Sequence, residues 1–454
     1  MGYSEVEREE PLSPLGRLFL TPEMHQICHC IMGCQNPIDV AAVTSEIANS
    51  AMVRLPRFSS LLVRDSRGRE HWRQTQVDVG RHVVVVEDLV SDAGDEDAVN
   101  DYVADLAVST PLSSDKPLWE VHLLRAHNCI IFRIHHALGD GISLMSMLRE
   151  SCRRADKPDQ RSSVGSMATN YPWNWVDGKK KLWKVVVGVL LGLVFLMKFV
   201  LRALWVKDKT TAVSGGAGVE LWPRRLATAK FWLDDMKAVK NAVGNATIND
   251  VLFGIVSSGL SRYLDLRSPK ALQDGVQITG LAMVNLREQP GLQDLSDMIG
   301  GNPGNRWGNK FGMLLVPFYY HQSGANPLQY VKRAKQMMDQ KKQSFEAHFT
   351  YKMQKRLMSL YGPKVASWLN YRIVCNTTFL ISNVTGPKEE ITIAGNPVKY
   401  LRLNNTSLPH AITLHMVSYA GRADMQILVA KDIIPDPQVL AKCFEDALHQ
   451  MKDA

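Results

Sequence analysis

The sequence predicts a mixed α/β protein built from two globular domains. Its 454 residues are more than one ordinary hydrophobic core organises, so two compact units are expected. Hydrophobic residues make up 45% of the chain and charged residues 22%, a composition typical of folded globular proteins. Short apolar runs such as residues 82–86 alternate with helical periodicity such as residues 96–109, which indicates strands and helices in the same domain.

The composition changes twice in the middle of the chain. Residues 153–170 are rich in Lys, Asp, Gln, Ser and Gly, and residues 207–218 are again polar and rich in Gly. Stretches of this kind are typical of connections between domains. We therefore expect an N-terminal domain at 1–160, a linker at 161–218 and a C-terminal domain at 219–454.

The second half has the same α/β character as the first. Residues 245–250 contain the polar side chains that begin a helix, and the apolar spacing continues this amphipathic helix through Leu264. Residues 379–384 form a short apolar run that leads into a Gly-Pro turn, as a buried strand does.

A hydrophobic block of 22 residues, 185–206, lies inside the predicted linker. As a helix it would extend roughly 33 Å, which is long enough to cross a bilayer. Lys198 and Arg202 are four residues apart and so share a helix face, which gives the second half of the block a basic stripe. Residues that suit a membrane interface surround it: Lys179, Lys180, Lys181, Trp183, Lys184 and Trp205. We expect the block to contact a membrane, with a buried core helix as the alternative.

Charge and cysteine usage restrict the partners and the compartment. The formal net charge of +8 favours an anionic partner, which acidic lipid, nucleic acid or a polyphosphate-bearing substrate would each satisfy. The seven cysteines are odd in number and lack framework spacing, so we expect reduced thiols facing the cytosol and no metal site. The first eleven residues have no apolar run, and we expect no signal peptide.

The segment 135–141, His-His-Ala-Leu-Gly-Asp-Gly, carries the candidate chemistry. It ends the second strand of a predicted hairpin, residues 119–124 and 129–136, so His135 and His136 should point to opposite faces. A neutral imidazole is suited to accept a hydroxyl proton at cytosolic pH. Asp140, between two glycines, could hold the turn or pair with a buried cation. The alternative is a satisfied core histidine beside a turn aspartate.

This HHxxxDG pattern resembles the wax ester synthase/diacylglycerol acyltransferase family, plant branch. Six further segments and the run before the motif extend the resemblance over most of the chain: PLSP (11–14), PLSSDKPLWE (111–120), ND (249–250), NLR (285–287), NRWGN (305–309), SNVTGP (382–387) and SY (418–419). The resemblance implies two α/β domains with the fold of chloramphenicol acetyltransferase-like CoA-dependent acyltransferases, meeting at a tunnel. A departure is the Ser113-Ser114 pair, where many relatives carry Asp-Arg.

The resemblance also implies a reaction and its residues. His136 would be the general base, with His135 beside it and Asp140 in a structural role. A long-chain acyl group would pass from acyl-CoA, as co-substrate and without a further cofactor, to a fatty alcohol or to diacylglycerol. Asn249 is a candidate oxyanion donor, although it could equally cap a helix. The expected substrate-binding residues are Gly141, Asn249, Asn305, Ser382 and Asn383.

The expected cellular location follows from the substrates, because the acceptors dissolve in membranes and acyl-CoA is cytosolic. One crossing of the membrane at 185–206 would separate His136 from Ser382, so we expect this segment to lie in the interface or to re-enter. The family resemblance suggests the endoplasmic reticulum membrane with both domains facing the cytosol, and the plasma membrane as a second location. The chain contains five glycosylation sequons, which we expect to be unmodified: Asn245, Asn376, Asn383, Asn404 and Asn405.

Several alternatives share part of this pattern. His135 and Asp140 have the spacing of glycerol-phosphate acyltransferases, but their Phe-Pro-Glu-Gly-type segment is absent from the sequence. BAHD acyltransferases end with Asp-Phe-Gly-Trp-Gly, and a serine hydrolase needs Gly-x-Ser-x-Gly; the sequence has neither. Peptide-synthetase condensation domains would not explain the apolar block. An inactive lipid-binding module and an acyltransferase with another alcohol acceptor stay open, whereas nucleic-acid binding has only the net charge in its favour.

Overall fold

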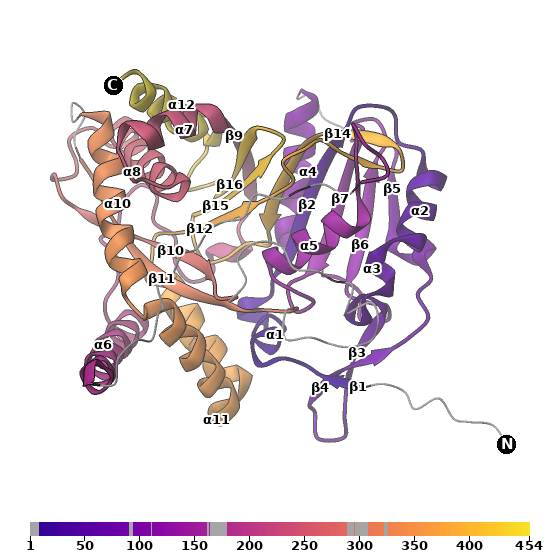
Figure 1. Ribbon diagram of the computed structural model, residues 1–454, viewed down its shortest axis with the longest axis horizontal. Coiled ribbons are helices and arrows are strands. Elements are labelled where there is room, and N and C mark those ends of the chain that lie inside the picture. Colours follow the sequence, from indigo (N-terminus) through magenta and orange to yellow (C-terminus); the bar gives the residue numbers. More distant parts are fainter. Residues whose placement is uncertain are drawn as a thin grey trace. The chain divides into compact units, whose positions relative to one another are not determined.

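A computed structural model of the chain describes residues 9–89, 94–109, 111–160, 163, 179–287, 295, 307–321 and 326–454 (Figure 1). The chain divides into two compact units. Unit 1 comprises Met1–Ser166, Gly291–Lys310 and Thr385–Thr406, and unit 2 comprises Met167–Pro290, Phe311–Val384 and Ser407–Ala454. Each unit contains a sheet and helices, so the predicted mixed α/β architecture with two domains is confirmed.

Unit 1 is organised around a seven-stranded sheet. Its strands are β2 (Ile27–Cys34), β5 (Val83–Val86), β6 (Trp119–Leu124), β7 (Cys129–His135), β8 (Arg153–Arg154), β13 (Ile391–Ile393) and β14 (Asn396–Asn405). They follow the order β5-β6-β7-β2-β14-β13-β8. β5 pairs with β6 in parallel, and the other neighbouring strands pair antiparallel. The motif-bearing strand β7 is therefore an interior strand of this sheet.

The hairpin predicted before the two histidines is confirmed. β6 and β7 are antiparallel, with Trp119 opposite Ile134, and Asn128 adopts the left-handed conformation in the turn, with φ of 47°. Asparagine tolerates this conformation better than most residues, which suits a tight turn. All seven residues of β7 are buried, so both faces of the strand are covered. A strand held in this way fixes the point at which His135 and His136 leave the sheet.

Shorter elements complete unit 1. A three-stranded sheet contains β1 (Glu9–Pro11), β3 (Ser60–Arg64) and β4 (Glu70–Gln74) in the order β1-β4-β3. The helices are α1 (Pro14–Leu18), α2 (Val40–Asn49), α3 (Ala51–Arg54), α4 (Asp95–Ser109) and α5 (Gly141–Ser151), with 3-10 turns η1 (Pro22–Met24), η2 (Pro56–Ser59) and η3 (Val79–His82). α5 follows β7 after a short loop, which positions the loop at the end of the sheet.

Unit 2 contains a six-stranded sheet. Its strands are β9 (Arg224–Trp232), β10 (Gln277–Asn285), β11 (Phe311–Tyr319), β12 (Phe379–Thr385), β15 (Ile412–Tyr419) and β16 (Arg422–Ala430). They follow the order β11-β10-β12-β15-β16-β9. β12 confirms the buried strand predicted at 379–384, and its first three residues are buried. This sheet supplies one side of the largest hydrophobic core of unit 2, where the rings of Phe318 and Phe379 lie 5.0 Å apart.

Unit 2 also contains helices, several of which pack against this core. They are α6 (Lys179–Leu204), α7 (Leu233–Ala242), α8 (Ile248–Arg267), α10 (Pro327–Gln343), α11 (Glu346–Cys375) and α12 (Pro437–Asp453), with the turn η4 (Val219–Leu221). α8 begins where the sequence predicts it, because Thr247 and Asp250 form a reciprocal capping box. α8 packs against α10 and α12, and most of its residues are buried.

The compact units do not follow the predicted domain boundaries. The region 219–454 was expected to form one C-terminal domain, yet 291–310 and 385–406 belong to unit 1. The segment 385–406 belongs to unit 1 because its strand β14 pairs with β2 and so extends the unit 1 sheet. The hydrophobic block 185–206 is also no isolated linker, since α6 belongs to unit 2. Pairing between strands far apart in sequence leaves no local signal in composition.

One face of α6 packs against the rest of unit 2. Phe199 and Ala203 share a buried cluster with Ile373 of α11. Arg202, expected on a basic stripe with Lys198, is instead buried and paired with Asp208 at 2.8 Å, whereas Lys198 is exposed. The expected stripe is wrong because a step of four residues also rotates the side chain by about 40°, enough to turn Arg202 inward. Among the helices that the structure describes, none has both the length and the apolar character needed to cross a membrane.

Candidate active site

The loop between β7 and α5 contains the predicted motif. β7 ends at His135, and α5 begins at Gly141 with Asp140 as its N-cap. Oδ1 of Asp140 accepts a hydrogen bond from the Ser143 amide at 3.0 Å, which satisfies one of the free amides of the first helical turn. Its Oδ2 accepts from the Lys310 amide, also at 3.0 Å. Asp140 therefore ties the loop to α5 and to a distant segment of the chain.

That distant segment, residues 307–310, lies along the motif loop within unit 1. Trp307 Nε1 donates to the Leu138 carbonyl at 2.7 Å, and the Gly308 amide donates to Ser143 Oγ at 3.1 Å. Ser143 Oγ in turn donates to the Gly308 carbonyl at 3.2 Å. These bonds fix the loop at several points, so the orientation of His136 is determined by packing as well as by the hairpin.

Gly139 is required where the motif loop meets the first turn of α5. A Cβ atom at this position would lie 2.9 Å from the Ser143 Cβ atom, whereas its 3.4 Å distance from the Trp307 ring is an ordinary contact. A contact as short as 2.9 Å forces one of the neighbours to move. The glycine before Asp140 thus permits the close approach of Ser143 to the loop.

His136 is clamped by one asparagine. The side chain of Asn309 donates from Nδ2 to the His136 carbonyl at 2.9 Å, which identifies its Oδ1 as the acceptor. His136 Nδ1 lies 3.0 Å from this Oδ1 and is therefore the donor of that hydrogen bond. With the proton on Nδ1, the lone pair of the neutral imidazole is on Nε2. The ring is half-buried and packs against Phe19 with ring centroids 4.3 Å apart.

The environment of His136 keeps the imidazole neutral. Burial lowers the pKa of His136 below its ordinary value, although the nearby Asp140 carboxylate and the hydrogen bond to Asn309 act in the opposite direction. A lowered pKa means that most molecules carry the unprotonated base at neutral pH. This is the protonation state that a general base needs.

His135 has different surroundings. Its side chain is buried, its Nδ1 accepts from the Ala137 amide at 3.1 Å, and its ring meets that of His25 edge to face at 4.9 Å. Burial and the neighbouring histidines lower the pKa of His135 well below its ordinary value. The acceptor role of its Nδ1 gives His135 a structural function in the turn.

The other predicted substrate-binding residues lie in different parts of the chain. Gly141 is the first residue of α5 in unit 1. In unit 2, Asn383 on β12 donates from Nδ2 to Asn249 Oδ1 on α8 at 2.7 Å, so two segments predicted to be functional meet there. Ser382, beside Asn383, is half-buried. Asn305 lies outside the residues that the structure describes.

Asn309 was not among the predicted site residues. It belongs to the same NRWGN segment as Asn305, and the segment was the available signal. Asn309 is separated from His136 by 173 residues, and no periodicity relates two positions so distant. The choice of residue within the segment therefore required the tertiary structure.

All seven cysteines are free thiols, and burial raises the pKa of the Cys30 thiol to about 12. Reactive cysteines have a lowered pKa, so Cys30 is unsuited to be a nucleophile. Within the described part of the chain, no three His, Cys, Asp or Glu side chains are grouped in a way that could hold a metal ion.

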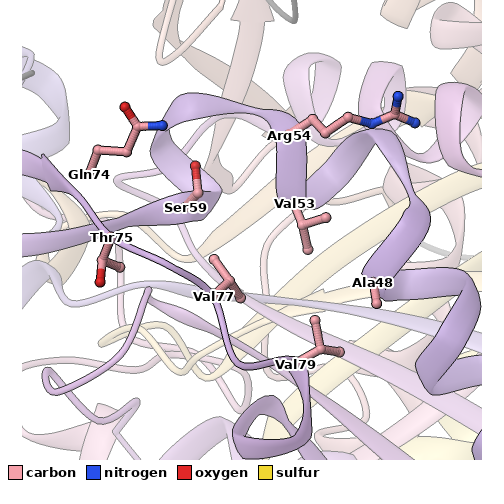
Figure 2. Close-up of a pocket in the computed structure, with 8 residues that line it drawn as sticks. All are labelled: Ala48, Val53, Arg54, Ser59, Gln74, Thr75, Val77 and Val79. Carbon is pink, nitrogen blue, oxygen red and sulfur yellow. The ribbon is translucent and has the colours of Figure 1, made fainter. Parts of the chain in front are cut away.

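A separate pocket opens in unit 1 (Figure 2). It has a volume of about 450 Å³, and its lining combines apolar side chains with hydroxyl, amide and guanidinium groups. Its lining residues are Ala48, Val53, Arg54, Ser59, Gln74, Thr75, Val77 and Val79. None of them is a predicted site residue or a partner of His136 described above, so this pocket is distinct from the motif loop.

The fold is that of known acyltransferases. The solved wax ester synthase/diacylglycerol acyltransferase from Marinobacter aquaeolei VT8 matches with a TM-score of 0.61 and 18% identity, covering 97% of this chain and 98% of that one. The trichothecene 15-O-acetyltransferase from Fusarium sporotrichioides matches with a TM-score of 0.63 and 14% identity, covering 99% and 97%. The predicted CoA-dependent acyltransferase fold is confirmed, whereas the tunnel stays a prediction.

Sequence comparison identifies the family. The model of the wax ester synthase/diacylglycerol acyltransferase catalytic domain matches residues 21–252, and that of the WS/DGAT C-terminal domain matches residues 307–452. Wax ester synthase/diacylglycerol acyltransferase 11 of Arabidopsis thaliana is 35% identical, over 99% of this chain and 96% of that protein. Wax ester synthase/diacylglycerol acyltransferase 4 of Arabidopsis thaliana is 34% identical, over 99% of this chain and 91% of that protein. The chain belongs to the wax ester synthase/diacylglycerol acyltransferase family.

Proposed function

We propose that this protein is an acyl-CoA-dependent O-acyltransferase. It transfers a long-chain acyl group to a fatty alcohol, which yields a wax ester, or to diacylglycerol, which yields triacylglycerol. Family membership supports this activity. The observation that carries the role of His136 is its hydrogen bond to Asn309, which places the proton on Nδ1 and the lone pair on Nε2.

His136 acts as general base in a direct transfer. Its Nε2 accepts the hydroxyl proton as the acceptor oxygen attacks the thioester carbonyl of acyl-CoA. The tetrahedral intermediate collapses, the carbon–sulfur bond breaks, and the imidazolium returns its proton to the departing thiolate. Throughout the cycle Asn309 Oδ1 accepts from Nδ1, so it stabilises the imidazolium that forms in the first step. Acyl-CoA is the co-substrate, and the proposed reaction uses no further cofactor.

Asp140 and His135 support the loop in this scheme, because the side chain of each accepts a hydrogen bond from a backbone amide of the loop or of α5. Asn249 is the candidate donor to the oxyanion. Its Oδ1 is occupied by the Asn383 amide, which leaves the Asn249 amide group as a donor of fixed orientation. Gly141, Asn305, Ser382 and Asn383 remain the proposed substrate-binding residues.

Membrane association fits the acceptors, which dissolve in lipid. We propose that the protein lies on the cytosolic face of the endoplasmic reticulum membrane, with the plasma membrane as an alternative, and that α6 contacts the bilayer interface. Several apolar side chains of α6 are exposed, which supports this placement. Asn245, an exposed residue of a turn, provides a test because its sequon would be accessible to glycosylation in the lumen. Glycosylated Asn245 in cells would overturn the proposed orientation.

One competition assay tests the activity and identifies the acceptor. Purified full-length protein receives a mixture of fatty alcohol and diacylglycerol with labelled palmitoyl-CoA, and the products are separated by chromatography. Labelled wax ester or triacylglycerol that disappears in His136→Ala supports the proposal. Hydrolysis to free palmitate alone, or no turnover with either acceptor or with a panel of other alcohols, would overturn it.

A further inference from the structure

The structure leaves a large apolar surface exposed on two helices of unit 2. α6 lies beside α11 (Figure 1), and the two helices pack through Phe195, which faces Phe349, and through Phe199. Other side chains of the same two helices are apolar and exposed. The α6–α11 face consists of six side chains that are each at least 50% exposed: Leu190, Leu193, Met197, Leu360, Tyr361 and Trp368.

A break in α11 creates part of this face. Gly362 has a non-helical backbone with φ of 75° and ψ of 178°, and Pro363 follows it. Pro363 has no backbone N–H to donate to the carbonyl one turn earlier, so the two halves of α11 meet at a kink. Leu360 and Tyr361 precede the kink and are among the most exposed apolar side chains of α11. Large apolar side chains exposed to water raise the free energy of the protein, and a partner that covers them removes this cost.

The charge of the two helices is strongly one-sided. α6 and α11 contain eleven lysine and arginine residues and a single acidic residue, Glu346, a formal charge of +10 compared with +8 for the whole chain. Glu346 is buried and pairs with Lys341 at 2.6 Å. Lys198, on α6, is exposed, as are four cations of α11: Lys352, Lys355, Arg356 and Lys364. Five exposed cations therefore lie on the same two helices as the exposed apolar side chains.

We infer that the α6–α11 face is a docking surface for an anionic lipid membrane, on which the protein lies without crossing it. Apolar side chains would enter the interface while the surrounding cations meet acidic headgroups. A nucleic acid would match the charge but not the exposed leucines, and a protein partner would match the leucines without requiring so uniform a charge. The inference rests on the proposed function, because that function places the acceptors in the bilayer. It adds α11 as a second membrane element and a preference for acidic lipid.

Flotation with vesicles tests the charge preference. Full-length protein is mixed with vesicles of phosphatidylcholine, or of phosphatidylcholine with roughly one third phosphatidylserine, and the bound fraction is measured over a salt series. We expect at least tenfold tighter binding to the acidic vesicles, and a loss of this difference as the salt rises. Equal binding to both vesicles at low salt, or no binding, would overturn the inference.

Matched variants identify the surface. Lys355→Glu/Arg356→Glu should weaken binding to acidic vesicles at least tenfold, whereas Lys332→Glu/Arg333→Glu, an exposed Lys-Arg pair on α10, should bind like the wild type. Leu360→Ser/Trp368→Ser should weaken binding to both vesicle types. Its control is Leu266→Ser, because Leu266 is 63% exposed on α8. A control that loses as much binding as its test variant contradicts the assigned surface.

Two further measurements separate this inference from its alternatives. Ester formation from acyl-CoA and a short-chain alcohol dispersed without vesicles should be the same in all these variants. If the wild type makes no ester under these conditions but still binds acidic vesicles, the proposed activity fails and the docking surface stands. Sedimentation analysis detects a second copy of the chain as the partner: dimers that dissociate in Leu360→Ser/Trp368→Ser, together with unchanged flotation, would refute the membrane assignment.

Discussion

Asn309 holds His136 at two points, since its amide donates to the His136 carbonyl at 2.9 Å and its Oδ1 accepts from Nδ1 at 3.0 Å. The first bond fixes the orientation of the asparagine, and the second fixes the tautomer of the histidine. Together they determine which ring nitrogen can accept a proton. A single residue 173 positions away in the sequence thereby prepares the proposed base for its task.

Replacing Asn309 should shift the pH profile in opposite directions. The hydrogen bond from Nδ1 raises the pKa of His136, so Asn309→Ala should lower that pKa and move the acidic limb of kcat/KM to lower pH. Asn309→Asp should move it to higher pH, because a carboxylate stabilises the imidazolium. Both variants should have a plateau rate reduced by roughly 10- to 100-fold, since the ring loses its orientation. Rate measurements from pH 5 to pH 8 with both variants check this.

In the wild type, activity should be constant above about pH 6.5, the ordinary histidine pKa, and decline only at lower pH. A limb that does not move in either variant would show that Asn309 has only a structural role.

The two histidines should respond differently to substitution. His136→Ala should abolish ester formation, a loss of about 10²-fold or more for a general base. His135→Ala should retain a measurable fraction, with reduced stability, because the Ala137 amide loses its acceptor at a cost of about 1–3 kcal/mol. Initial rates of ester formation, with melting temperatures as the control for folding, compare the two. Equal residual activity in both variants contradicts the assignment of His136.

Asp140 should act through the stability of its loop. Asp140→Ala removes the acceptor of the Ser143 and Lys310 amides, which should cost about 2 kcal/mol and lower the melting temperature by about 4–8 °C. Asp140→Asn keeps an oxygen for the helix cap and should lose less. Calorimetry and activity measured together check this. If Asp140→Asn is as stable as the wild type but as inactive as His136→Ala, the carboxylate has a chemical role.

His410 should make unit 2 sensitive to acid. Burial and the nearby Arg224 lower the pKa of His410 to about 3, far below the unfolded value near 6.5. Because the folded pKa is depressed, the stability contribution is complete above pH 6.5 and is lost as the pH falls. The loss is about 1.4 kcal/mol per pH unit down to the folded pKa.

His410→Gln should therefore lose less stability than the wild type between pH 7 and pH 4.5. The comparison uses the change in urea midpoint for each protein, since the substitution also removes the contact with Thr377 Oγ1 at 2.9 Å. Identical changes in the two proteins would assign the acid sensitivity to other groups.

The attachment of α6 depends on Asp208, which accepts from Arg202 at 2.8 Å and from the Thr279 amide at 2.6 Å. Asp208→Ala leaves the Arg202 charge buried without this partner and should destabilise the protein by about 3–5 kcal/mol. Arg202→Met in the same chain should restore part of this loss. Urea unfolding of the wild type, the two single variants and the double variant completes a double-mutant cycle, which measures the coupling energy of the pair. Additive effects would show that the pair is not coupled.

The sequence by itself determined the features that depend on local periodicity and capping. Alternation predicted β6 and β7, the glycines around Asp140 predicted the turn, and the polar residues 245–250 predicted the start of α8, where the structure has Thr247 as the N-cap. The motif also singled out His136 as the candidate base, and this role stays a prediction. Each of these signals acts over a few residues, where backbone geometry and neighbouring side chains decide the conformation.

Only the tertiary structure decided the features that join distant segments. It brought Asn309 to His136, placed 385–406 in unit 1 through the pairing of β14 with β2, and turned Arg202 inward to Asp208. These contacts depend on which strands pair and which faces are buried, and no local pattern encodes that choice. The motif thus identified the candidate base, and long-range packing determined the tautomer in which it can work.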